Sequence, residues 1–111
     1  MTERKLVDDP DLQPEKIYPV TVTAMLDSHP ELRPVVIDGL LREGETANVI
    51  APPKTGKSFL AGNLAWCVAD GRPWLSHDCR QGRVLIIDNE LHPETLANRL
   101  TRIADAMQIP L

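Results

Sequence analysis

A stretch of eight residues near the middle of the chain has the spacing of a phosphate-binding loop. Residues 51–58 read Ala-Pro-Pro-Lys-Thr-Gly-Lys-Ser, the Walker A pattern with alanine in place of the usual first glycine. Gly56 lets the backbone approach a phosphate, Lys57 supplies a positive charge for the β and γ phosphates, and the Ser58 hydroxyl suits Mg²⁺. We therefore expect Mg-ATP to bind here, with Ser58 on the metal. The expected nucleotide-binding residues are Ala51, Pro52, Pro53, Lys54, Thr55, Gly56, Lys57, Ser58 and Phe59.

The alternative interpretation of these residues is a Pro/Gly turn that carries a solvated lysine. The surroundings argue against it, because the pattern follows an expected strand at residues 46–50 and opens an expected helix at Lys57, which is the arrangement the motif requires. Lys54 is a second lysine in the loop. It could approach the phosphates, but solvation is the simpler account of a loop lysine.

Two acidic side chains follow a second apolar run, residues 83–87. Asp88 and Glu90 would lie at the carboxyl end of a strand, where open α/β sheets bind their ligands. Asp88 could hold the magnesium as a Walker B acid, or Glu90 could be the base that orients the attacking water. In a third interpretation both carboxylates only cap or solvate the turn before Pro93. We favour Glu90 as the catalytic residue, although position alone separates it only modestly from Asp88.

The elements that would position these residues follow an α/β order. The apolar run at 83–87 suits a strand of a parallel sheet, covered on both faces. The helix from Lys57 has one apolar face and should end at Gly71, and a second amphipathic helix should start at Pro93. Strand, loop, helix, strand and helix make a right-handed βαβ unit. The apolar helix positions are Leu60, Leu64, Cys67 and Val68, then Leu96, Leu100, Ile103 and Met107.

The first third of the chain carries weaker signals. We expect residues 1–20 to be a polar, flexible lead-in and residues 21–111 to be the domain. Residues 21–28 suit a short helix that ends before Pro30, residues 35–37 suit a strand, and residues 38–39 and 43–44 suit turns.

Composition narrows the class of protein. The chain has 111 residues, a net charge of −4 and two cysteines, which fits one small domain without a disulfide framework. No segment suits a transmembrane helix or a secretory signal, so we expect a reduced, cytoplasmic protein. The sequence has no long basic run, so it does not predict a surface that binds nucleic acid.

Several residues that could do chemistry have simpler explanations. Cys67 should belong to the core, and the two tryptophans should be packing anchors. The spacing of His77 and Cys79 does not predict a zinc site. Arg99 and Arg102 should lie on the solvated side of the last helix, with a subunit contact as the alternative.

The stretch from Ile37 to Pro110 resembles the start of the RecA-like P-loop ATPases, in the AAA-type branch related to plasmid and phage replicative hexameric helicases. The matching pieces are IDGLLREGETANVIAPPKTGKS, ADGRPWL, GRVLIIDNE and PETLANRLTRIADAM. The resemblance implies a RecA-like parallel sheet with flanking helices, ATP and Mg²⁺ as ligands, a homo-hexamer and a role on DNA. It also implies that Glu90 activates water and that the Walker B acid comes from a later strand, which argues against Asp88 in that role.

Such ATPase domains span about 200 residues, and this chain ends after the second strand–helix pair. We therefore expect the N-terminal part of a truncated domain that binds ATP with little or no hydrolysis. Two rival functions remain open. One is a P-loop kinase or other phosphoryl transferase, and the other is a nucleotide-binding regulatory module that does not turn over.

Overall fold

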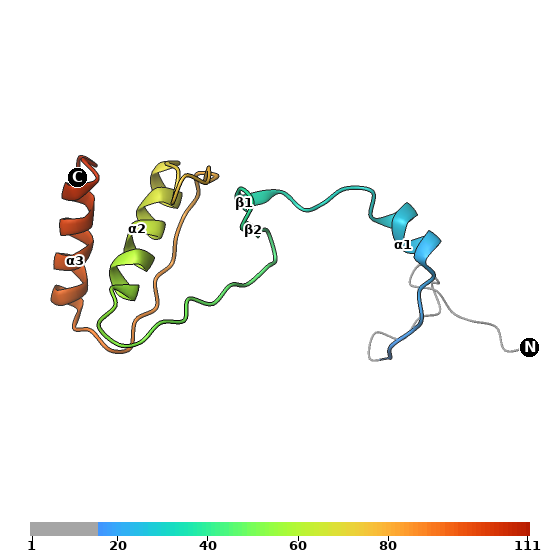
Figure 1. Cartoon of the computed structure of the whole chain (residues 1–111), viewed down its shortest axis with the longest axis horizontal. Helices are drawn as coiled ribbons and strands as arrows, with labels where there is room; N and C mark the ends of the chain where they lie inside the picture. Colours follow the sequence, from blue (N-terminus) through green and yellow to red (C-terminus); the bar gives the residue numbers. More distant parts are fainter. Residues whose placement is uncertain (1–15) are drawn as a thin grey trace, which may run out of the picture. The chain divides into compact units, whose positions relative to one another are not determined.

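The computed structural model describes residues 16–111, and the chain divides into two compact units, residues 1–32 and 33–111. The first unit contributes α1 (Val22–Ser28). The second contains β1 (Val35–Ile37), β2 (Leu41–Arg42), α2 (Lys57–Asp70) and α3 (Pro93–Ala106) (Figure 1). Most of the expected lead-in lies outside the described residues. No helix among residues 16–111 is long and apolar enough to span a membrane.

Helix α1 is the short helix that the sequence predicts. The Thr21 hydroxyl caps its start by accepting a hydrogen bond from the Ala24 N–H at 3.1 Å, the usual role of threonine at this position. The helix ends at His29, whose N–H donates to the Met25 carbonyl at 3.0 Å. The next residue is a proline, which disfavours helical geometry in the residue before it.

Strands β1 and β2 form a small antiparallel hairpin, with Val35 opposite Arg42 and Ile37 opposite Leu41. The turn between them contains Gly39, whose φ of 79° favours glycine. The other edge of β1 also has a partner, because an isolated bridge pairs Ile37 with Cys79. The expected strand at 35–37 and the expected turns around it are therefore confirmed.

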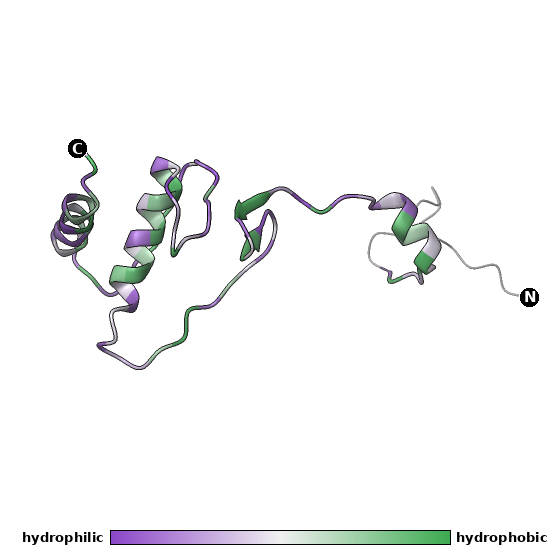
Figure 2. Cartoon of the chain, turned by 45° about the horizontal axis from the view of Figure 1, so that its top comes forward, coloured by the Kyte–Doolittle hydropathy of each residue, from purple (hydrophilic) through white to green (hydrophobic). Residues whose placement is uncertain are grey.

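The core of the second unit joins this hairpin to α2. Ile37, Cys67 and Trp74 are buried together, as the interpretation of Cys67 and of Trp74 as packing residues requires. Burial raises the pKa of the Cys67 thiol, so the side chain stays neutral and packs as a small apolar group. Figure 2 shows hydrophobic residues in both strands and along much of α2. The residues packed around this cluster are Val36, Leu41, Leu60, Leu64, Cys79 and Met107.

Helices α2 and α3 lie side by side, with their N-terminal ends at the same end of the pair (Figure 1). Gly62 is buried in this contact, and a Cβ atom there would lie 2.6 Å from Cδ1 of Ile103. The missing side chain therefore lets α3 approach closely. The Trp66 indole N–H donates to the Leu100 carbonyl at 2.9 Å and ties the two helices together.

The C-terminal end of α2 has a Schellman cap. Gly71 adopts a left-handed conformation with φ of 68°, as the sequence predicts for this glycine. The Arg72 N–H then donates to the Cys67 carbonyl at 2.8 Å and the Gly71 N–H to the Val68 carbonyl at 3.4 Å. The Gly82 N–H adds a second bond to the Val68 carbonyl, at 3.0 Å.

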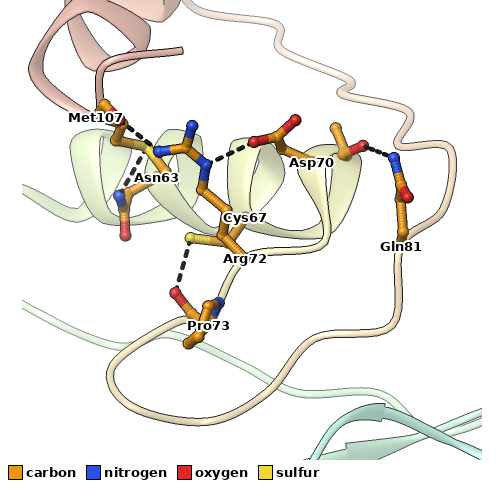
Figure 3. Close-up of polar contacts among 8 residues, drawn as sticks. Asn63, Cys67, Asp70, Arg72, Pro73, Gln81 and Met107 are labelled. Carbon is orange, nitrogen blue, oxygen red and sulfur yellow. Dashed lines mark hydrogen bonds and ion pairs between the residues drawn. The ribbon is translucent and has the colours of Figure 1, made fainter.

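Side chains near this cap tie the surrounding segments to α2 (Figure 3). The Gln81 side-chain amide donates to the Ala69 carbonyl at 3.2 Å. The Arg72 guanidinium pairs with Asp70 and also donates to the carbonyl of Met107, just after α3. The bonds to the Ala69 and Met107 carbonyls satisfy acceptors that the ends of α2 and α3 leave without partners. They also hold the segment after α2 against the C-terminal end of that helix.

The structure differs from the prediction in the sheet. Residues 46–50 and 83–87, both expected as parallel strands, belong to no strand and make no ladder hydrogen bonds in the described part of the chain. Their apolar side chains are left in solvent, with Ile50 exposed to 91%, Leu85 to 84% and Ile87 to 80%. A strand requires a neighbour at ladder spacing, and neither segment has one among residues 16–111. The parallel sheet is therefore not formed here, and the sheet present is the antiparallel β1–β2 pair.

We predict that Gly71→Ala will lower the free energy of unfolding by about 1–2 kcal/mol, because it places a Cβ on a left-handed residue. That Cβ would also lie 3.2 Å from Cβ of Gln81. Gly82→Ala is the matched control, since its φ is not left-handed and no atom lies within 4 Å of the new Cβ. Urea unfolding measures both variants. Equal losses in the two would contradict the proposed role of the cap.

Candidate functional site

The 51–58 loop turns sharply before α2. Lys54 and Gly56 both have positive φ, 62° and 93°, so the backbone curls just ahead of the first helical residue, Lys57. The Thr55 hydroxyl donates to the Pro52 carbonyl at 2.8 Å and holds this curl. A Cβ atom at Gly56 would meet nothing within 4 Å. The space in front of this residue is therefore open to a ligand.

The start of α2 is electrostatically suited to an anion. The first N–H groups of a helix have no acceptor within the helix, and they carry the positive end of its dipole. No side chain caps the start of α2, and its first turn has no acidic residue. A phosphate placed here would accept hydrogen bonds from the first N–H groups of α2, which have no side-chain acceptor.

A cavity of about 440 Å³ lies in front of this helix start, within the size range of small-ligand sites. It brings together the loop, the start of α2, the turn before α3 and one side chain of α3 itself. Its charged side chains are three basic and two acidic ones, a mixture that fits a phosphate chain and a cation together. The lining residues are Lys54, Gly56, Lys57, Ser58, Phe59, Asp88, Glu90, Leu91 and Arg99.

Three polar side chains in this cavity have no partner in the described part of the chain. Lys57, Ser58 and Glu90 make no side-chain hydrogen bond or ion pair with residues 16–111. Their ammonium, hydroxyl and carboxylate groups are therefore free to bond with a ligand. A ligand that carried phosphates and a hard cation would use all three.

Asp88 differs from Glu90 because its carboxylate is already in use. Its Oδ1 accepts hydrogen bonds from the backbone N–H groups of Glu90, at 2.8 Å, and of Leu91, at 3.0 Å. The bonds from Leu91 and Glu90 lower the pKa of Asp88, and the charge of Arg99 adds to the effect. For Asp88, the structure thus matches the interpretation in which the side chain caps the turn before Pro93.

Arg99 is a site residue that the sequence interpretation missed. Instead of lying on a fully solvated side of α3, its side chain is half-buried and lines the cavity. Its guanidinium carbon lies 5.4 Å from the centre of the Phe59 ring, a distance at which the cation is attracted by the ring. One signal was available, because Arg99 follows the packed residue Leu96 by three positions and so borders the buried face of the helix. Arg102, by contrast, is exposed as expected.

A family model described as AAA domain matches residues 11–110, all but the first ten residues and the last one. The chain belongs to the AAA domain family. Membership identifies it as one of the AAA-type P-loop ATPases, with the nucleotide binding that is general to them. Comparison with curated proteins and comparison with solved structures each gave no match.

The AAA domain gathers most of the expected site residues at one place. The expected residues that line the cavity are Lys54, Gly56, Lys57, Ser58, Phe59 and Glu90. Ala51, Pro52, Pro53 and Thr55 do not line it. Thr55 and Pro52 instead shape the loop through their hydrogen bond. Among residues 16–111, no group of three or more His, Cys, Asp or Glu side chains could hold a metal ion. A cation in this cavity would therefore also need oxygen atoms from a bound small molecule.

Proposed function

We propose that this AAA domain binds Mg-ATP through the 51–58 loop and that Glu90 orients the water for hydrolysis. The observation that carries the proposal is the shared cavity of Lys57, Ser58 and Glu90, whose polar groups have no partner among the described residues. All three side chains are exposed, so water solvates them until a ligand takes its place. A nucleotide with its cation satisfies each of them.

Each residue of the loop has a distinct part in binding. Lys57 places its ammonium on the β and γ phosphates, and Gly56 leaves room for them in front of the first N–H groups of α2. Ser58 would supply one oxygen to the cation. Mg²⁺, when bound, neutralises the charge that builds up on the phosphates.

Glu90 would act on water, because its carboxylate has no partner among the described residues. Its carboxylate would accept a hydrogen bond from a water molecule and take its proton as the water oxygen bonds to the γ phosphorus. The bond from that phosphorus to the bridging oxygen breaks, and ADP leaves with this oxygen. Asp88 has less freedom, because Oδ1 already accepts two backbone N–H bonds. This difference supports Glu90 as the base over Asp88 as the metal ligand.

The wider activity that we propose is that of a RecA-like ATPase related to the replicative hexameric helicases, acting on DNA as a homo-hexamer. The resemblance of residues 37–110 to that branch supports this assignment, and membership in the AAA domain family agrees with it.

We expect Lys57→Ala in the full-length protein to weaken ATP binding by about 10–100-fold, because a hydrogen bond to a charged group is worth about 1.5–3 kcal/mol. Arg99→Ala should cost less, about three- to fivefold, as a partly exposed charge does. Arg102→Ala removes the same charge from the same helix outside the cavity and should leave affinity unchanged. Titration with a fluorescent ATP analogue measures all three. Equal affinities for the wild type and Lys57→Ala would refute the binding proposal.

We predict that Glu90→Gln keeps ATP binding but slows hydrolysis by about 10²–10⁴-fold, the usual contribution of a general base. The amide preserves size and hydrogen bonding but cannot take a proton. Phosphate release in the full-length protein, measured beside the affinity for the analogue, tests this. Normal turnover of Glu90→Gln would remove the catalytic assignment and leave the binding assignment standing.

The proposed action on DNA predicts that single-stranded DNA stimulates hydrolysis by the full-length protein and that size-exclusion chromatography with light scattering detects a hexamer. A monomer that hydrolyses ATP at the same rate with and without DNA would exclude the helicase-related role. That result would leave a DNA-independent ATPase.

A further inference from the structure

We propose that Asp88 is a positioning residue for Glu90. The Asp88 carboxylate holds the backbone turn that directs Glu90 into the cavity of Lys57 and Ser58. The inference rests on the proposed function of Glu90 as the base. It gives Asp88 a part in catalysis without contact to the attacking water, the metal or the nucleotide.

The geometry of the turn is set by a single carboxylate oxygen. Oδ1 of Asp88 accepts the N–H of Glu90 at 2.8 Å and the N–H of Leu91 at 3.0 Å. Two bonds to one atom fix residues two and three positions further along the chain, as aspartate commonly does in turns. Glu90, the residue whose direction matters most for hydrolysis, lies within this turn.

Little else holds this segment. Residues 83–91 make no other hydrogen bond in the described part of the chain, since the expected strand at 83–87 has no ladder partner there. Pro93 begins α3 and has no N–H to donate. The direction of the Glu90 side chain therefore depends on Asp88 more than it would at the end of a paired strand.

Asp88 is negatively charged when it performs this role. Bonds from the N–H groups of Leu91 and Glu90 lower its pKa, and the basic side chains that line the same cavity are Lys54, Lys57 and Arg99. The stabilisation from these bonds is complete above the ordinary pKa of an aspartate, and it is lost as the pH falls through the lowered value. At neutral pH the charged acceptor makes stronger bonds than a neutral one would.

Two substitutions distinguish positioning from metal binding. Asp88→Asn keeps a side-chain oxygen that can accept the same two N–H bonds, whereas Asp88→Ala keeps none. A positioning role therefore predicts a large difference between the variants. A magnesium ligand predicts that both are impaired, because an amide is a poorer ligand for this cation than a carboxylate.

The experiment measures kcat, KM, analogue affinity and magnesium dependence in the full-length protein. We expect Asp88→Ala to lower kcat by about tenfold or more, because misplacing a catalytic group by about 1 Å can cost about 10²-fold. KM and affinity should stay within about twofold of the wild type. Asp88→Asn should recover most of the lost turnover. Asp105→Ala, which removes an exposed aspartate of α3 outside the cavity, is the charge control and should change nothing.

The outcomes separate this inference from the function on which it rests. Wild-type kcat in Asp88→Ala overturns the positioning role, and so does a parallel loss of affinity, which would mean that the site has collapsed. A raised magnesium requirement in Asp88→Asn overturns it in favour of a metal ligand. A wild-type protein that binds ATP without hydrolysis, or a fully active Glu90→Gln, overturns the role of Glu90 first. A wild type and Lys57→Ala of equal affinity would reject the nucleotide site as a whole.

Discussion

The close contact between α2 and α3 is the constraint on which the arrangement of the site depends. Gly62 allows the approach, because any side chain there would run into Ile103. The two helices then lie with their N-terminal ends together (Figure 1). As a result, the loop before α2 and the turn before α3 border one cavity. Lys57 and Glu90 are far apart in the chain, and this helix contact is what brings their surroundings together.

The charges in the cavity suit a ligand that is itself of mixed charge. Lys54, Lys57 and Arg99 are basic, while Asp88 and Glu90 are acidic, and the start of α2 adds the positive end of a helix dipole. An anion alone would be repelled by the carboxylates, and a cation alone by the basic side chains. A phosphate chain with a bound divalent cation would interact favourably with both the basic and the acidic side chains. Mg-ATP is therefore the ligand proposed for this AAA domain.

The segments that lead into the two site loops show where local pattern was insufficient. Residues 46–50 and 83–87 have the apolar, β-branched composition of buried strands, yet Ile50, Leu85 and Ile87 are mostly exposed. The composition of a segment reports what it would bury, but a strand exists only with a neighbour to pair with. Short local signals were more reliable, because Pro30 after α1, the Gly71 cap and Pro93 at the start of α3 need no distant partner.

The sequence by itself predicted the three helices, both ends of α2, the start of α3 and the residues proposed for the site. Those features depend on residues within a few positions of each other, such as the curl before Lys57, and backbone preferences decide them locally. Only the tertiary structure decided which residues meet. In the structure, Arg99 lies over the Phe59 ring at the cavity, and Ala51 and Pro53 do not line the cavity. The Asp88 carboxylate holds the turn that contains Glu90. Such outcomes depend on the distance and angle between two packed helices, which no spacing along the chain specifies.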